Sequence, residues 1–454
     1  MKIMDRYILK YLYDNTSNLD VKRAYDYLKS EIDFRFWSQG RHSAHSWDFY
    51  RASILSSLRQ PKWKKKIKTI LRFIKGDFKC RKSDANVIKE KLVLPPKGYN
   101  VLSVVNLPQE SREALDKCGV NYVYVDISKS AVNYDLPALE ALLTYQKVLQ
   151  QQTFSQLISK ETIKQVLKLY EDLRVELSNY SFDAVLVRTS ELFMEKILID
   201  IFRSFNKPSI TLLHGLPGIY TKATESRADY LLVWGDKIRD AFISTGYNPK
   251  NVMVAGNYKY SQIAPISDLR CSLDDVLILT TETWADGQHE WEYDKFSTHD
   301  RSLLITYLYS VENVLKQNGV THARLRPHPH VNKEWISEYI DSNFYTLDRD
   351  DLMSSLRRAT MCIGPTSSTM IESLMSGVSY LTYEPGDGIH NAMGSKLVTP
   401  FNTEYKYLKV AYNEDQLSEL IQSHYKPEAN KLLQDFLQSF NPQVIKQILD
   451  GQKA

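Results

Sequence analysis

Two polar stretches in the second half of the chain carry residue types suited to binding a phosphate. The first reads Arg324-Leu-Arg326-Pro-His328-Pro-His330, and the second reads Gly364-Pro-Thr366-Ser367-Ser368-Thr369 with Glu372 shortly after it. Each stretch follows a short apolar run typical of a buried strand, and open α/β sheets bind ligands beyond the carboxyl ends of their strands. Hydroxyl-rich helix starts, arginine and histidine all interact favourably with phosphate oxygens. The pattern therefore predicts a nucleotide-phosphate site without a Walker lysine or a metal cluster.

His328 lies between two prolines, which exclude it from a helix interior and predict a rigid turn at a strand end. We expect it to contact the phosphate or to stabilise the leaving group; the alternative is an ordinary turn histidine. Arg326 lies at the same predicted strand edge, and its planar fork is suited to gripping a phosphate.

The segment Thr366, Ser367 and Ser368 is predicted to open a helix whose first turn binds the phosphate. The alternative is that these hydroxyls only cap the helix, although capping and phosphate binding do not exclude each other. Glu372 is predicted to accept hydrogen bonds from a ribose diol. Its alternative role is a capping box with Thr369.

Two residues in the first half of the chain are candidates for a general base. His214 follows a buried-looking run, and its pKa is close to working pH, so it is suited to activating a hydroxyl. Its alternative role is that of a hydrogen-bonded core histidine. Glu191 follows another predicted strand and is the rival base, unless it only complements a helix dipole.

Composition indicates a globular protein with no metal or disulfide framework. The 454 residues are 43% hydrophobic and 25% charged, with a net charge of +4, and the four cysteines lack metal-ligand spacing. The acidic run Asp348-Arg-Asp350-Asp351 precedes a predicted helix, so helix capping is preferred to metal binding. Neither a signal peptide nor a spanning helix is predicted, and a reducing cytosol is the simplest compartment.

A basic segment between Arg59 and Lys82 predicts a membrane surface contact. It holds eleven lysines and arginines against one acid, with aromatic and aliphatic residues between them. An amphipathic helix of this kind is suited to anionic lipid. The residues expected at the lipid are Trp63, Lys64, Lys65, Lys66 and Lys68. The alternative is a solvated basic helix; nucleic acid is not expected as a partner because no fold-level motif accompanies the run.

The elements that would position these residues alternate between strand and helix from about residue 99 onward. The strand-like runs are Tyr99–Val105, Tyr122–Ile127, Phe182–Val187, Ser209–Leu213, Tyr230–Trp234, Val252–Ala255, Val276–Thr280, Ala323–Leu325, Phe344–Leu347, Met361–Ile363 and Ser379–Tyr383. This alternation predicts two doubly wound parallel sheets in series, with a cleft between two domains.

We therefore predict three regions. Residues 1–95 form a helical, basic extension, residues 96–262 a Rossmann-like acceptor domain, and residues 263–454 a Rossmann-like nucleotide-sugar domain. Helical patterns are expected at 416–423 and 429–449, and the last helix is a candidate for return to the N-terminal domain.

Three blocks between about residues 180 and 390 resemble GT-B glycosyltransferases of bacterial surface polysaccharides. They are Leu213-His214-Gly215-Leu-Pro217-Gly218, then Ala228-Asp229-Tyr-Leu-Leu-Val-Trp234-Gly235 with Val254-Ala-Gly256-Asn257, and finally His328-Pro329 with Ser367-Ser368. The group includes sialyl- and Kdo-transferases that use CMP-sugars and teichoic-acid polymerases that use CDP-polyols. Residues 1–95 resemble no family.

The resemblance implies a metal-independent, cytoplasmic enzyme that is peripheral to the inner face of the cell membrane. It would move a sugar, most plausibly a nonulosonic acid such as sialic acid or Kdo, from a nucleotide donor to a hydroxyl of a capsule, lipopolysaccharide or related glycan or glycolipid. No cofactor is implied, and Thr281 joins the nucleotide-binding residues because its loop faces the nucleotide in this family. The alternatives are a CDP-polyol phosphotransferase and a non-catalytic nucleotide-sugar-binding partner.

Overall fold

The structure is a computed structural model that describes most of the chain after residue 90. The described residues are 91–126, 134–149, 159–190, 192–217, 228–260, 262–280, 301–328, 336–390 and 396–451, with residue 220 and parts of 20–31 and 152–157. Of the predicted site, Glu191, Thr281, Trp63, Lys64, Lys65, Lys66 and Lys68 lie outside this set. No helix in the described part is long and apolar enough to span a bilayer.

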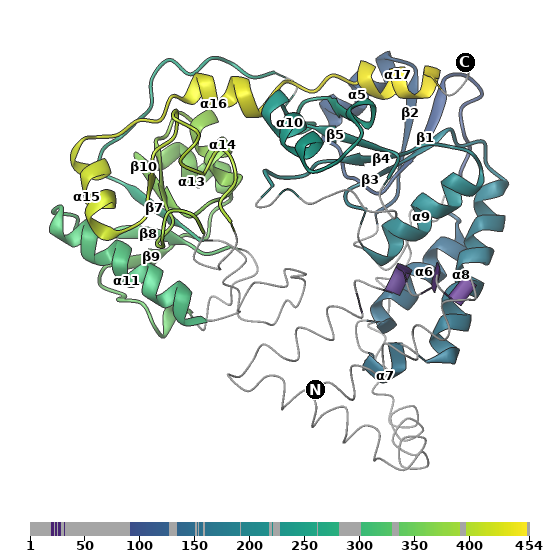
Figure 1. Cartoon of the computed structure of the whole chain (residues 1–454), viewed down its shortest axis with the longest axis horizontal. Helices are drawn as coiled ribbons and strands as arrows, with labels where there is room; N and C mark the ends of the chain where they lie inside the picture. The colour runs from purple at the N-terminus through teal and green to yellow at the C-terminus, as the bar shows by residue number, and fades with distance from the viewer. Residues whose placement is uncertain are drawn as a thin grey trace, which may run out of the picture. The chain divides into compact units, whose positions relative to one another are not determined.

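Two six-stranded sheets organise the chain, and every strand pair whose register is defined is parallel (Figure 1). The first sheet has the order β2-β1-β3-β4-β5-β6 and the second β12-β11-β10-β7-β8-β9. This confirms the predicted α/β class with two doubly wound, Rossmann-like sheets. Of the described residues, those in Met1–Leu212, Thr224–Leu232 and Pro442–Ala454 form one compact unit, and those in Leu213–Ala223 and Val233–Asn441 form a second. The sheets separate in sequence between Val254 and Val276, around the predicted boundary at 262.

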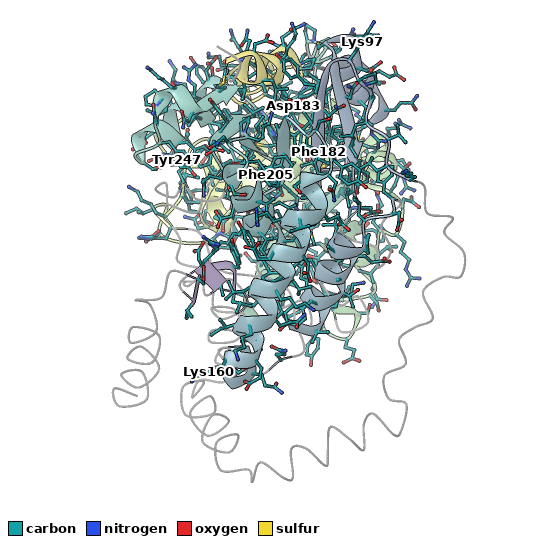
Figure 2. All side chains as sticks on the ribbon, turned by 90° about the vertical axis from the view of Figure 1, so that its right-hand side faces the viewer. Lys97, Lys160, Phe182, Asp183, Phe205 and Tyr247 are labelled. Carbon is teal, nitrogen blue, oxygen red and sulfur yellow. The ribbon has the colours of Figure 1, made fainter. Side chains whose placement is uncertain are left out.

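The first sheet contains β1 (Tyr99–Ser103), β2 (Val120–Tyr124), β3 (Ala184–Val187), β4 (Ser209–Leu212), β5 (Tyr230–Val233) and β6 (Val252–Val254). Its helices are α5 (Gln109–Lys117), α6 (Pro137–Leu149), α7 (Phe154–Leu157), α8 (Lys160–Ser178), α9 (Phe193–Ser204) and α10 (Asp236–Ser244), with a 3-10 turn at Pro249–Asn251. Helix α9 packs on β3 and β4, and α6 and α8 contact α9 in turn (Figure 1). Aromatic rings continue this core at one end of α9, where Phe202 lies between Phe182 and Phe205 at centroid distances of 6.2 and 6.3 Å (Figure 2).

The described residues between 20 and 31 are helical and belong to this first core. Ala24, Tyr27 and Leu28 are fully buried among its apolar side chains. The Tyr27 hydroxyl donates to Asp200 Oδ2 on α9 at 2.7 Å. Part of the segment predicted as an N-terminal extension therefore lies in the core of the first unit.

The second sheet contains β7 (Val276–Leu279), β8 (Ala323–Arg326), β9 (Tyr345–Leu347), β10 (Met361–Gly364), β11 (Tyr380–Tyr383) and β12 (Val410–Ala411). Its helices are α11 (Arg301–Gln317), α13 (Leu352–Arg358), α14 (Thr369–Met375), α15 (Glu414–Gln422) and α16 (Ala429–Phe436). The central strands β7 and β10 are buried along their whole length, because helices cover both faces of such a sheet.

The chain after α16 differs from the single helical run predicted for 429–449. Pro442 has no N–H and disfavours a helical conformation at Asn441, so residues 437–442 are extended and α17 begins at Gln443 (Gln443–Gly451). This segment is hydrogen-bonded to the chain after β6, where the Asn257 N–H donates to the Gln438 carbonyl at 2.9 Å. Gly256 permits the approach, since a Cβ there would lie 2.1 Å from the Ser439 carbonyl oxygen and its φ is +73°.

Helix α17 belongs to the same compact unit as β1. The Tyr99 hydroxyl at the start of that strand donates to Asp450 Oδ1 at 2.6 Å. The last helix of the chain thus packs with the first sheet rather than the second.

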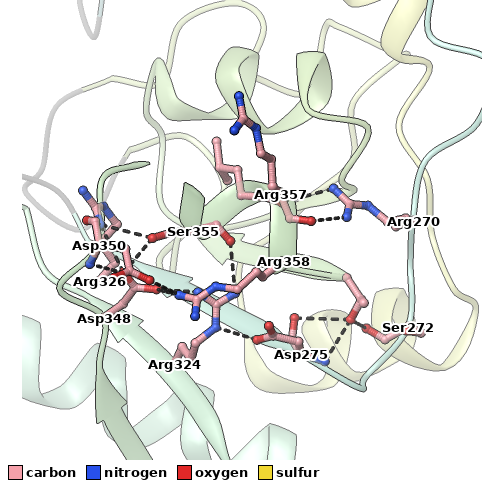
Figure 3. Close-up of polar contacts among 12 residues, drawn as sticks. Arg270, Ser272, Asp275, Arg324, Arg326, Asp348, Asp350, Ser355, Arg357 and Arg358 are labelled. Carbon is pink, nitrogen blue, oxygen red and sulfur yellow. Dashed lines mark hydrogen bonds and ion pairs between the residues drawn. The ribbon is translucent and has the colours of Figure 1, made fainter. Parts of the chain in front are cut away.

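A charged network ties β8, β9 and α13 together in the second unit (Figure 3). Its centre is the Asp348 carboxylate, whose side chain is 0% exposed and pairs with Arg324 and Arg326. The Ser355 hydroxyl on α13 also donates to Asp348, at 2.6 Å. Arg324 makes a second ion pair, to Asp275 at 2.6 Å.

The network fixes the direction of the pKa shift at Asp348. Burial by itself would raise the pKa of this carboxyl, but the hydrogen bonds from Ser355 and Arg324 and the charges of Arg324 and Arg326 outweigh it and lower the pKa. A carboxyl whose folded pKa is below its unfolded value, near about 3.9, stabilises the fold above that value. That contribution is lost as the pH falls through the lower, folded pKa.

Asp348→Asn should destabilise the second unit by about 3–5 kcal/mol, because it leaves two arginines beside a neutral amide in a buried site. Denaturant unfolding followed by fluorescence measures the change. The acid destabilisation of the wild-type chain below about pH 4 should also shrink in the variant.

Asp350→Asn is the matched control, because Asp350 is exposed and pairs with Arg358 at the surface. Its cost should be below about 1 kcal/mol. Equal losses in the two variants would contradict the assigned role of Asp348.

Candidate functional site

The ends of four neighbouring strands in the second sheet bring the predicted nucleotide residues to one edge. In the order β11-β10-β7-β8, the strands lead into Glu384, Thr366, Thr280 and His328. The strand order reverses between β7 and β10, because the chain adds β8 and β9 on one side of β7 and β10 to β12 on the other. Ligands of doubly wound sheets bind at such a reversal, beyond the carboxyl ends of the strands.

The turn that holds His328 is fixed to the end of β7. The His328 N–H donates to Thr280 Oγ1 at 2.8 Å, and Thr280 is only 6% exposed. Pro327 before it is buried, whereas His328 is partly exposed. The histidine therefore lies at the strand edge where it was predicted, and its role at a phosphate stays a prediction.

The serine turn after β10 is organised by a buried carboxylate. The Thr366 N–H donates to Glu384 Oε2 at 2.9 Å, and Glu384 is 2% exposed. The Thr369 N–H donates to Ser367 Oγ at 3.2 Å. Ser368 is the N-cap residue of α14, but its hydroxyl makes no capping hydrogen bond. Capping alone therefore does not account for Ser368, and its hydroxyl is available in the described structure for a ligand.

Glu372 lies on α14 with a buried carboxylate oxygen, Oε2, that has no hydrogen-bond partner among the described residues. Burial raises the pKa of this carboxyl, and the nearby charge of Lys259 partly opposes the shift. A buried acceptor without a donor is costly, and a ribose hydroxyl would supply that donor. The geometry is compatible with the predicted ribose contact.

Arg326 has a different set of partners from the phosphate predicted for it. Its Nη1 donates to Asp348 Oδ1 at 3.2 Å and to Ser355 Oγ at 3.3 Å (Figure 3). These contacts account for the arginine without a ligand, so its part in phosphate binding stays a prediction. In the acidic run beside it, the Asp351 carboxylate accepts from the Ser354 N–H and caps α13, as expected.

The His214 turn and the serine turn lie in the same compact unit. A Cβ built on Gly215 would lie 3.7 Å from Ser368 Oγ, so the residue after His214 approaches that hydroxyl. The turn is held from behind by Trp234, whose Nε1 donates to the Leu213 carbonyl at 2.7 Å. His214 itself is exposed. The structure thus brings one of the two candidate bases next to the serine turn; the other, Glu191, lies outside the described residues.

Two charged residues near the first sheet were missed in the sequence. Glu195 is fully buried on α9, and Arg188 is exposed directly after β3. An acid inside the apolar run Phe193-Met-Glu-Lys-Ile-Leu-Ile was the available signal for Glu195. Nothing in the local sequence distinguishes Arg188 from an ordinary surface arginine.

The fold and the site define a class: an α/β protein of two Rossmann-like sheets whose second sheet presents polar groups at its strand-order reversal. No family model and no curated protein matches the chain. Among solved structures, it is similar to S. aureus MnaA in complex with UDP at 12% identity and a TM-score of 0.45, covering 77% of this chain and 95% of that one. It is also similar to the wall teichoic acid polymerase TagF at 12% and 0.38, covering 79% and 89%.

A third similar structure is the lipopolysaccharide outer core galactosyltransferase WaaB, at 10% identity and a TM-score of 0.42, covering 78% of this chain and 99% of that one. Likeness at this distance does not assign an activity, because one fold serves many functions. The function has to be argued from the site.

Gly364→Ala should disturb the serine turn from within the sheet. A Cβ at Gly364 would lie 2.2 Å from the Tyr380 hydroxyl, which donates to the Pro365 carbonyl at the start of that turn. We expect a loss of about 1–3 kcal/mol in the free energy of unfolding, as for other overpacked cores. Nucleotide affinity should fall as well, because the turn moves.

The double variant Gly364→Ala/Tyr380→Phe is the control, since it removes the hydroxyl that is struck. It should recover part of the stability relative to the sum of the two single changes, measured as a double-mutant cycle. Additive losses would mean that this contact does not set the turn.

Proposed function

We propose that the chain is a nucleotide-sugar-dependent glycosyltransferase whose second sheet binds the nucleotide. One observation carries the proposal: the strand-order reversal between β7 and β10 gathers the His328 turn, the Ser367-Ser368 turn and the unpartnered Glu372 oxygen in one unit. Hydroxyl and imidazole groups suit the phosphate, and the carboxylate suits the ribose.

The chemistry asked of these residues is modest. The acceptor oxygen bonds to the anomeric carbon of the donor sugar, and the bond from that carbon to the phosphate oxygen breaks. The acceptor proton passes to a base, His214 or Glu191. The nucleotide leaves with the electron pair, and His328 and the serine hydroxyls stabilise the charge that develops on its phosphate. The described residues contain no group of three or more metal-ligating side chains, and none of these steps requires a metal.

The finer assignment rests on the resemblance of the His-Gly, His-Pro and Ser-Ser blocks. It makes the donor a CMP-linked nonulosonic acid, the acceptor a bacterial surface glycan or glycolipid, and the arrangement of the two domains that of GT-B enzymes with a cleft. The basic segment around Trp63 would hold the enzyme at the inner face of the membrane. Co-sedimentation of the full chain with anionic and neutral liposomes tests that location, and equal recovery with both would refute it.

The nucleotide preference is tested by thermal unfolding of the full chain with CMP, CDP, UMP, UDP and GDP. One nucleotide should raise the unfolding temperature in a saturable way, and CMP is the one expected. His328→Ala should cut turnover with the matching donor by about two orders of magnitude, the scale seen when one charge-stabilising donor is removed. Loss of nucleotide binding in this variant would also fit.

His322→Ala is the matched control, because His322 is exposed at the opposite end of the same strand, just before β8. It should leave both the thermal shift and turnover unchanged. No shift with any nucleotide, or unchanged kinetics in His328→Ala, would contradict the proposal.

One observation favours a second function, a polyol-phosphate transferase of the teichoic-acid type. The approach of Gly215 to Ser368 places the His214 turn beside the proposed phosphate site, as a base for attack on phosphorus would require. In that case the pyrophosphate bond breaks, His214→Ala abolishes transfer and Glu191→Ala does not. The reverse result in a CDP-glycerol transfer assay excludes this function. A non-catalytic binding partner would bind nucleotide but consume no donor with acceptor present.

A further inference from the structure

The first sheet has a strand-order reversal of its own. The chain adds β2 on one side of β1 and β3 on the other, so the reversal lies between β1 and β3. The rule that places the nucleotide at the second sheet therefore predicts a second ligand position beyond the carboxyl ends of β1 and β3. These strands and the residues that follow them belong to the first compact unit.

Arg188 is the first residue after β3 at this edge, and its side chain is exposed. Within the described part of the chain, it forms neither a hydrogen bond nor an ion pair. Its charge lies close enough to Tyr124 and to Glu195 to lower the pKa of both groups, against a larger rise from burial. The guanidinium is thus a positive charge at the reversal with its hydrogen-bond donors unused.

Glu195 does not neutralise that charge. Its carboxylate is 0% exposed, and neither oxygen has a hydrogen-bond partner among the described residues. Burial raises the pKa of Glu195 to about 7, so the group is only about half ionised at neutral pH. A buried, unpartnered carboxyl is costly to the fold and is characteristic of functional sites.

An aromatic surface adjoins the arginine on the edge strand β2. The rings of Tyr122 and Tyr124 are nearly parallel, with an interplanar angle of 8° and centroids 6.5 Å apart. Arg112 of α5 lies over Tyr124, with its Cζ 5.9 Å from the ring centroid. Arg112 is held there by the Leu107 carbonyl at 2.7 Å and by Asn106 Oδ1 at 2.9 Å.

One carboxylate also faces this surface. Asp126, 8% exposed, follows β2 and lies close enough to Tyr124 to raise its pKa. The charged groups known to face Tyr124 are therefore two arginines and one aspartate. The excess is positive, and flat aromatic rings with arginine beside them suit a sugar ring that carries an anionic group.

We propose that Arg188, together with Tyr124 and Arg112, binds an anionic sugar at the strand-order reversal of the first sheet. The inference rests on the proposed function in one respect: the bound sugar would be the acceptor end of the glycan. The anionic group is a carboxylate or a phosphate, either of which takes a bidentate hydrogen bond from the arginine fork. The acceptor would then be an acidic glycan.

The test uses matched pairs of sugars on the full chain, with binding followed by saturation-transfer NMR. The pairs are 3′-sialyllactose with lactose, cellobiouronic acid with cellobiose, and glucose 6-phosphate with glucose. At least one anionic member should bind about tenfold or more tightly than its neutral partner, the scale of one charge-assisted hydrogen-bond pair. Arg188→Gln should abolish this preference, and Arg188→Lys should keep part of it, since it retains the charge but loses the fork.

Arg174→Gln is the matched control, because Arg174 is an exposed arginine of α8 in the same unit. It should leave the preference intact. No preference in any pair, or a preference that survives Arg188→Gln, overturns the inference. Circular dichroism confirms that the variants are folded.

Nucleotide binding, measured on the same samples, separates the two proposals. Nucleotide binding without any preference for anionic sugars overturns only the acceptor site. A preference that depends on Arg188, in a chain that binds no nucleotide, supports the anionic-sugar site and overturns the proposed transferase.

Discussion

The constraint on which the site depends is that parallel strands deliver their carboxyl ends to one edge of a sheet. In the second sheet this edge collects a threonine from β7, a histidine from β8, a serine turn from β10 and a glutamate from β11. Hydrogen bonds then lock the pieces together: Thr280 holds the His328 backbone, and Glu384 holds the serine turn. The reversal between β7 and β10 leaves this edge as the place where a ligand fits. The residues are distant in sequence, and only the sheet makes them neighbours.

Much of this arrangement could be predicted from the sequence, because the strands are short apolar runs followed at once by polar turns. The predicted Val276–Thr280 and Met361–Ile363 differ from β7 and β10 by one residue each. Strand β12 was missed because Val410–Ala411 is too short to show a pattern. The break before α17 was missed because its signal, Pro442, lies in an otherwise apolar, helix-like stretch.

The side-chain partners were less predictable than the strands. Arg326 has the residue type and position of a phosphate ligand, yet its partner Asp348 comes from the neighbouring strand β9, a pairing that spacing along the chain does not reveal. The burial of Glu195 likewise depends on how α9 packs against β3, β4 and other helices. Conversely, His328 and Ser368 were placed correctly at strand ends because proline and hydroxyl residues mark such turns locally. Their chemical roles follow from a ligand, which local patterns do not contain.

The central claim is that the edge at β7 and β10 binds a nucleotide phosphate. A crystal structure of the chain with its preferred nucleotide tests this most directly. The account predicts the phosphate within hydrogen-bond distance of His328 or of the Ser367-Ser368 turn, with a ribose hydroxyl on Glu372. A nucleotide bound elsewhere, with His328 and both serines in contact only with protein, would contradict it.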